Sequence, residues 1–123
     1  MEKLNPGQIA ETLAVSYLTQ SGLTVITRNY ACRLGEIDLI LKESSNTTDV
    51  LVFAEVRYRK QARYGGAAAS ITKAKRFRLI RTAQRFIQDY PRYAHWPCRF
   101  DVVALSGELV QPDIRWIQQA FDV

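Results

Sequence analysis

The chain has 123 residues, of which 47% are hydrophobic and 24% are charged, and its net charge at pH 7 is +5. This length suits one domain over residues 1–123, and the hydrophobic share excludes a disordered chain. No apolar run approaches the roughly 20 residues that a membrane span needs, no signal-peptide pattern opens the sequence, and two cysteines are too few for a disulfide framework, so we expect a cytoplasmic protein.

The first predicted element is a helix over residues 5–21, whose apolar side chains recur at helical spacing. Asn5 suits the N-cap, and Pro6 suits the first helical position, where its missing N–H costs nothing. Gly22 then provides a stop.

Three strands are predicted next, at residues 23–29, 35–42 and 50–59, from their β-branched and aromatic side chains and the turns between them. The strand 50–59 is apolar on both faces over its first half, which indicates a central, buried position. Its second half is charged, so we expect this strand to emerge at a site.

A loop over residues 60–69 contains Gly65 and Gly66 and is followed by a second helix, which Ser70 caps and which runs to about Tyr90 before Pro91. We expect its inner face to carry the apolar residues Ile71, Ala74, Phe77, Ile80, Ala83, Ile87 and Tyr90.

The chain then continues with a strand at 98–105 and a candidate last strand within 108–117, while 118–123 has no assignment. The order α-β-β-β-α-β predicts an α/β fold, in which three strands form an antiparallel meander. The second helix allows a crossover to the fourth strand, so the sheet is expected to be mixed and flanked by helices.

Charge is concentrated in one segment of the chain. Residues 57–92 hold eleven of the 17 basic residues and one of the 12 acidic residues, a net charge of +10 against −5 for the remainder. A basic surface beside an acidic remainder is typical of nucleic-acid binding. A solvated basic helix is the alternative, although such helices usually mix both signs.

Acidic residues on two of the strands could share a site. Glu55 and Arg57 lie on one face of their strand, and Glu36 and Asp38 lie on one face of theirs. If the two strands pair, Asp38 and Glu55 lie side by side and repel each other. Mg²⁺ relieves that repulsion, and such an ion can polarise a phosphodiester and activate water.

The sequence GEIDLI, then FAEVRYR, a GG-containing loop and a basic helix resembles the YraN-like family of bacterial proteins. That family is similar to the archaeal Holliday-junction resolvases and to the PD-(D/E)XK, restriction-endonuclease-like superfamily. The resemblance covers nearly the whole chain. It implies a restriction-endonuclease-like core and a Mg²⁺ or Mn²⁺ site in which Asp38 and Glu55 are ligands, Glu11 is an additional acid, and Glu36 is an extra or supporting ligand.

Arg57 stands where the superfamily motif has Lys. Arginine cannot accept a proton, but it can orient a phosphate through two hydrogen bonds. Lys60 or Lys73 could supply the missing amine. The residues expected to contact nucleic acid are Arg57, Arg59, Lys60, Arg63, Lys73 and Arg76.

Structural interpretations remain open for several residues. Glu11 could serve the helix dipole, Glu55 could pair with Lys73, Asp101 is expected to pair with Arg99, and His95 is expected at the surface. We therefore expect a divalent-metal-dependent endonuclease acting on structured or branched DNA, with Asp38, Glu55 and Arg57 as its catalytic residues. The alternatives are a non-catalytic nucleic-acid-binding module and a protein-interaction role, and a homodimer is open.

Overall fold

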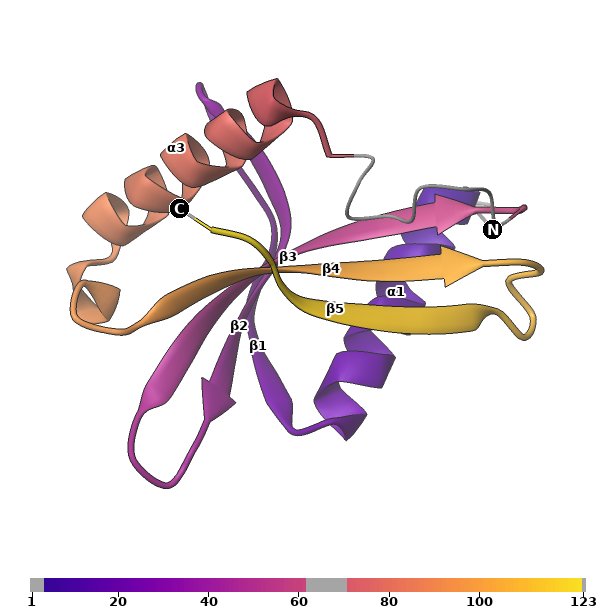
Figure 1. The fold of residues 1–123 in the computed structure, drawn as a ribbon, viewed down its shortest axis with the longest axis horizontal. Helices are drawn as coiled ribbons and strands as arrows, with labels where there is room; N and C mark the ends of the chain where they lie inside the picture. Colours follow the sequence, from indigo (N-terminus) through magenta and orange to yellow (C-terminus); the bar gives the residue numbers. More distant parts are fainter. Residues whose placement is uncertain (1–3, 62–70, 123) are drawn as a thin grey trace.

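The computed structural model describes residues 4–61 and 71–122. Its elements are α1 (Pro6–Gln20), β1 (Leu23–Cys32), β2 (Gly35–Ser44), β3 (Asp49–Arg59), α3 (Lys73–Asp89), a 3-10 turn η1 (Pro91–Tyr93), β4 (Cys98–Ser106) and β5 (Asp113–Phe121). The strands form one mixed sheet in the order β1-β2-β3-β4-β5, in which only the β3–β4 pair is parallel. The predicted element order and the mixed sheet are thus confirmed (Figure 1).

The N-terminal helix starts as predicted. Asn5 is the N-cap, its side chain accepts a hydrogen bond from the backbone N–H of Gln8, and the Gln8 side chain accepts one from the N–H of Asn5. This reciprocal capping box satisfies two of the backbone donors that a helix N-terminus leaves without partners. Pro6 occupies the first helical turn, as expected.

Each helix packs on its own face of the sheet. On the α1 face the core is aliphatic and includes Ala14, Leu18, Leu39 and Val103. On the α3 face the core combines aliphatic side chains with five aromatic ones, Phe53, Phe86, Tyr93, Phe100 and Phe121. The strand β3 contributes to both cores, which confirms its predicted central and buried position.

The second helix departs from the prediction in its start and in its phase. It begins at Lys73, and its N-cap is Thr72, whose hydroxyl accepts from the N–H of Lys75 at 3.1 Å. Ser70, Gly65 and Gly66 lie outside the described residues. The buried helical residues are Leu79, Thr82, Ala83 and Phe86, whereas the predicted inward residues Phe77 and Tyr90 are 59% and 49% exposed. The predicted inner face is confirmed for Ile71, Ala83, Ile80 and Ile87, which are buried or pack against the core, and wrong for Ala74, Phe77 and Tyr90.

The centre of the buried face is displaced because a polar residue faces inward. Thr82 is fully buried, and its hydroxyl donates to the carbonyl of Arg78 at 2.7 Å, so the helix itself satisfies the buried group. A Cβ added at Gly35 would meet the Thr82 hydroxyl at 3.0 Å, and Gly35 has a φ of +151°. A glycine before Glu36 thus allows α3 to pack closely against the start of β2.

The first and last strands differ most in extent from the prediction, whereas β2, β3 and β4 differ by one or two residues. β1 continues to Cys32, beyond the expected end at Asn29. The last strand spans Asp113–Phe121 instead of lying within 108–117, because residues 107–112 form the turn before it. Gly107 has a φ of +87° in this turn, and Pro112 precedes the strand, where its missing N–H removes no ladder hydrogen bond.

Candidate active site

The candidate site lies where β2 and β3 separate. Their antiparallel pairing ends at Leu39 and Ala54. Beyond this pair β2 continues with β1 as far as Gly35, while β3 continues with β4 as far as Arg59. The next residue on each strand is acidic, Asp38 on β2 and Glu55 on β3.

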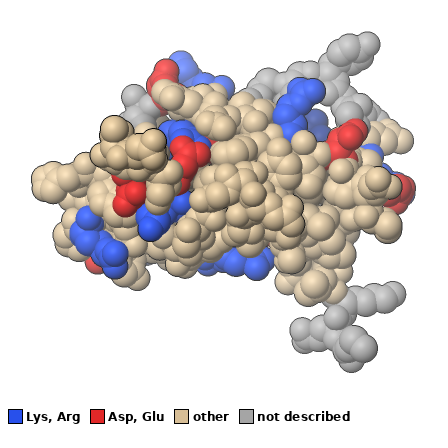
Figure 2. Space-filling view, turned by 90° about the horizontal axis from the view of Figure 1, so that it is seen from below, with Lys and Arg blue, Asp and Glu red and all other residues tan. Residues whose placement is uncertain are grey.

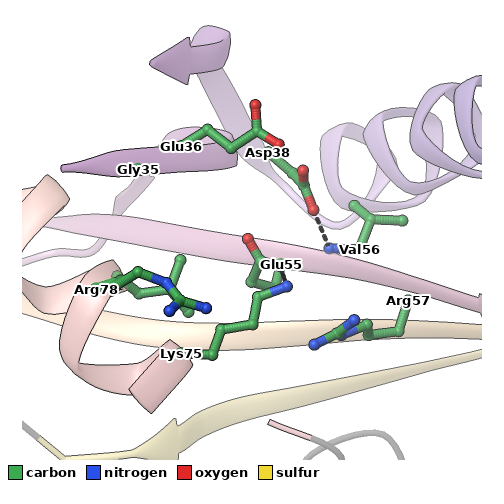
Figure 3. Close-up of a pocket in the computed structure, with 9 residues that line it drawn as sticks. Gly35, Glu36, Asp38, Glu55, Val56, Arg57, Lys75 and Arg78 are labelled. Atoms are coloured by element: carbon green, nitrogen blue, oxygen red, sulfur yellow. Dashed lines mark hydrogen bonds and ion pairs between the residues drawn. The ribbon is translucent and has the colours of Figure 1, made fainter. Parts of the chain in front are cut away.

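Where the strands separate, the backbone N–H of Val56 has no ladder partner on β2, and the Asp38 carboxylate accepts its hydrogen bond instead. The Asp38 Oδ2 atom accepts a hydrogen bond from the N–H of Val56 at 2.8 Å (Figure 3). The carboxylate therefore replaces the carbonyl that a continued ladder would have supplied. This bond fixes the Asp38 side chain across the fork, beside Glu55.

A cavity of about 380 Å³ opens at this fork. Acids from two strands and cations from β3 and α3 line it together (Figure 3). Its lining residues are Gly35, Glu36, Asp38, Glu55, Val56, Arg57, Lys75, Arg78 and Leu79. The predicted grouping of Asp38 with Glu55 and Arg57 is therefore present in the fold.

Glu55 is the most buried acid of the cavity, with 7% of its surface exposed. Burial, reinforced by the nearby charge of Asp38, raises the pKa of Glu55 to about 7, although Lys75 opposes the shift. The Lys75 Nζ atom lies 3.3 Å from Glu55 Oε2. The ion pair thus forms with Lys75, not with Lys73 as the sequence suggested.

Asp38 experiences a similar environment. Burial raises its pKa above the ordinary value, and the charges of Glu11 and Glu36 add to this effect. The hydrogen bond from Val56 and the charge of Lys75 oppose it. Two adjacent acids whose ionisation is disfavoured form a region that attracts a cation.

Arg57 follows Glu55 on the same face of β3. Its Nε atom is buried, and none of the described residues provides it with a hydrogen-bond acceptor. A buried guanidinium donor without an acceptor is costly, and an oxyanion in the cavity would satisfy it. Arg78 reaches the same cavity from α3.

The two further acids named from the sequence take different positions. Glu36 lines the cavity and is exposed. Glu11 does not line it, because its Oε1 atom is held by the Asn29 amide at 2.9 Å and by Arg28 at 3.2 Å. Within residues 4–61 and 71–122, no three acidic, histidine or cysteine side chains are grouped closely enough to hold an ion together.

The predicted nucleic-acid contacts are dispersed. Arg59 and Lys73 are exposed, and Lys60 is exposed with its Nζ atom 4.0 Å from a Glu108 carboxylate oxygen. Arg76 points back into the fold, where its Nε donates to the carbonyl of Ile71 at 3.2 Å and its guanidinium lies over Phe121. Arg63 lies outside the described residues.

Sequence reasoning missed Lys75 and Arg78. It named Lys60 and Lys73 as sources of an amine, and neither lines the cavity. A signal for Lys75 was present, because it lies four residues before the buried Leu79 and so shares its side of the helix. The incorrect phase of the helix concealed it.

A second cluster of charged residues serves the fold. Arg99 donates to Asp101 at 3.0 Å and also pairs with Glu43. Asp101 further accepts from the indole of Trp116 at 2.9 Å and from the N–H of Gln119 at 3.0 Å. The predicted Asp101–Arg99 pair is confirmed, and His95 is exposed as expected.

None of the described helices has the length and apolar character needed to span a membrane.

Comparison with known proteins places these residues in a family. The model described as "Uncharacterised protein family UPF0102" matches residues 10–105. A UPF0102 protein of Nitrosomonas europaea is 49% identical over 118 residues, which cover 96% of this chain and 94% of that protein. UPF0102 proteins of Methylobacillus flagellatus and Stutzerimonas stutzeri are 51% and 43% identical, over 94% and 98% of this chain and 95% and 98% of their own lengths.

Proposed function

Because the chain belongs to the uncharacterised protein family UPF0102, whose description names no activity, we propose its function from the site: a divalent-metal-dependent endonuclease that hydrolyses phosphodiester bonds in structured or branched DNA. The observation that carries this proposal is the presence of two acids, the half-buried Asp38 and the buried Glu55, with cations in one cavity. The resemblance to the PD-(D/E)XK superfamily adds support, since the proposed ligands match its motif.

The donor set fits a hard cation. Asp38 Oδ2 is bonded to the N–H of Val56, and Glu55 Oε2 is paired with Lys75, so each acid keeps one oxygen that no described residue binds. Mg²⁺ is often held by one or two carboxylates together with water and substrate phosphate. Asp38 and Glu55 would hold such an ion, with Glu36 beside them, and we expect binding to be weak before the substrate completes the ligand shell.

When bound, the ion would polarise the phosphodiester and lower the pKa of a bound water. The side chains of the cavity would provide the other contributions to catalysis. Arg57 and Arg78 present guanidinium groups that suit two oxygens of a phosphate and stabilise charge that develops on it. Lys75 brings the amine that Arg57 lacks to Glu55, so the motif's lysine function would be provided from α3 instead of β3.

The proposal is tested by cleavage of a labelled four-way junction and a labelled flap substrate in Mg²⁺ and in Mn²⁺. We expect Asp38→Asn and Glu55→Gln to fold normally and to lose at least about a hundredfold in rate. Glu108→Gln is the matched control, because Glu108 is an exposed acid outside the cavity. Equal rates for the parent and both cavity variants would reject the assignment of the site.

A non-catalytic nucleic-acid-binding module is the second candidate. It is favoured by Arg57 at the motif position and by Lys75, which already neutralises Glu55 without a metal ion. This candidate predicts salt-dependent DNA binding with no cleavage in either metal. The parent protein distinguishes the two candidates, because under this one it binds the labelled junction but does not cleave it in Mg²⁺ or in Mn²⁺.

A further inference from the structure

The outer side of α3 presents an aromatic ring to solvent. Phe77 is 59% exposed and lies in the second turn of a helix whose opposite side is buried through Leu79 and Ala83. The Arg81 guanidinium carbon lies 5.5 Å from the centroid of the Phe77 ring. Since Lys73, Phe77 and Arg81 are spaced four residues apart, they form one ridge along the helix.

The charged side chains of α3 are almost all basic. Among residues 73–89 there are six basic side chains and one acidic side chain. Lys75 is paired with Glu55 and Arg85 with Asp89, but no carboxylate of the described residues forms an ion pair with Lys73, Arg78 or Arg81. The ridge therefore combines an exposed ring with cations that lack an acidic partner within the described chain.

The face of the molecule turned away from α3 differs. Viewed from below the orientation of Figure 1, basic and acidic side chains both occur, and uncharged residues cover much of the centre (Figure 2). A polyanion therefore finds a matching surface along α3 and not on this other face.

We propose that Phe77, under Arg81, is a stacking platform for an unpaired base of a nucleic acid whose backbone enters the cavity. This inference rests on the proposed function and names the class of substrate: DNA with unpaired nucleotides beside the bond that is cleaved. Single-strand binding sites combine a basic track with aromatic rings, because every base has a face that stacks on a ring. A guanidinium beside the ring adds a further stacking and charge contribution.

The position of the ridge links it to the cavity. Arg78 lines the cavity and is the neighbour of Phe77 in the chain, while Lys75 lies two residues earlier and contacts Glu55. A strand whose phosphate is held by Arg78 would continue over the outer side of the helix, where Phe77 is exposed. A fully paired duplex keeps its bases inside the stack and has none to offer to the ring.

The test is a binding titration by fluorescence anisotropy in EDTA, so that cleavage plays no part. The probes are a duplex with a ten-nucleotide unpaired flap and a fully paired duplex of the same length. We expect Phe77→Leu, which keeps an apolar side chain of similar size but removes the ring, to weaken flap binding about tenfold and duplex binding less than twofold. Phe77→Trp should bind the flap as tightly as the parent.

Tyr90→Leu is the matched control, because Tyr90 is another exposed aromatic at the far end of the same helix. It should leave both affinities unchanged. Equal affinity of the parent and Phe77→Leu for the flap, an equal loss on both probes, or no binding of either probe by the parent would each overturn the proposal. Dissociation of a dimer by Phe77→Leu in sedimentation experiments, with unchanged flap affinity, would identify the ridge as a contact between copies and would overturn it as well.

These outcomes are separate from those of the cleavage assay. Flap binding that depends on Phe77 without any cleavage would sustain the platform and reject the nuclease. Cleavage together with a flap affinity that does not depend on Phe77 would support the nuclease and reject the platform.

Discussion

The sheet buries a core of similar size on each face, but different kinds of side chain fill the two cores. On the α1 face, small and aliphatic side chains such as Ala14 and Leu18 pack along the helix. On the α3 face, aromatic rings fill the space under the C-terminal half of the helix, around Phe86. Under its first turns the apolar packing gives way to Glu55, Lys75 and the cavity.

This difference shows how a small domain can provide both stability and a polar site. The aromatic rings packed around Phe86 anchor the C-terminal half of α3, so its other end does not need to close over the fork between β2 and β3. On the α1 face, by contrast, the side chains that β3 and β4 bury beneath the helix are apolar. Function is therefore expected on one face only.

The largest expected effect separates the two cores. Phe86 contacts the rings of Tyr30, Phe53, Tyr90 and Tyr93, so Phe86→Ala should lower the free energy of unfolding by about 4 kcal/mol. Leu18→Ala on the opposite face should cost about 3 kcal/mol. Denaturant unfolding in urea measures both.

The comparison is sharpened by the activity of the folded fraction of each variant. Phe86→Ala removes the anchor of α3 and should also slow cleavage, whereas Leu18→Ala should leave the rate per folded molecule unchanged. An equal loss of activity in both variants would mean that the two faces are not functionally distinct.

The next effect concerns the buried acid on the α3 face. Because burial raises the pKa of Glu55 from 4.5 to about 7, the folded protein holds this proton more tightly than the unfolded chain does. The contribution of Glu55 to stability in EDTA should thus be fully present below pH 4.5 and be lost as the pH rises through about 7. The full shift corresponds to about 3 kcal/mol.

Glu55→Gln removes this proton linkage, so its unfolding free energy should vary less than that of the parent between pH 4.5 and pH 8. Urea titrations at four pH values test this. A parent whose stability is flat over that range, or rises, would show that the Glu55 carboxyl is not held in its neutral form.

The fold was more predictable than the details of the site. Adjacency of β2 and β3 placed Asp38 and Glu55 near each other, each directly beyond the last paired residues, Leu39 and Ala54. That inference needed only the pairing of consecutive strands and the strand period, which is fixed by backbone geometry. The assignment of Arg57 to the same cavity followed from the same rule.

The phase of α3 could not be obtained in this way. Phe77 and Tyr90 are apolar but exposed, and Thr82 is polar but buried, so composition displaced the centre of the predicted buried face although Ala83 and Ile87 lie on it. Burial of Thr82 depends on its bond to the helix backbone and on the close approach of Gly35, a contact far away in sequence. Because the buried face of the helix was misplaced, Lys75 was not recognised as a residue of the site.

The corrected phase gives the third prediction. Lys75→Met should lower the cleavage rate about a hundredfold, because it removes the amine that contacts Glu55. Arg85→Met is the matched control, since Arg85 is exposed on the same helix, pairs with Asp89 and does not line the cavity. It should change the rate less than threefold. Similar losses in both variants would indicate that general basic charge on α3, not the Glu55–Lys75 contact, governs the reaction.

The smallest effect decides whether the α1 face contributes to the site at all. Glu11 is tied to Arg28 and Asn29, and Arg28 is 41% exposed, so Glu11→Gln should cost only about 0.5 kcal/mol of stability. Calorimetric titration of Mn²⁺ in the presence of an uncleavable junction should give nearly the same affinity as for the parent. Asp38→Asn, measured alongside, should abolish the binding.

The charge of Glu11 does reach Asp38, where it raises the pKa of that acid. Its removal should therefore ease ionisation of Asp38 and slightly favour cation binding near neutral pH. A tenfold loss of Mn²⁺ affinity in Glu11→Gln would instead mean that Glu11 leaves Arg28 and Asn29 to become a ligand once substrate is bound. In that case residues on both faces of the sheet would contribute to the site, and the assignment of function to the α3 face alone would be wrong.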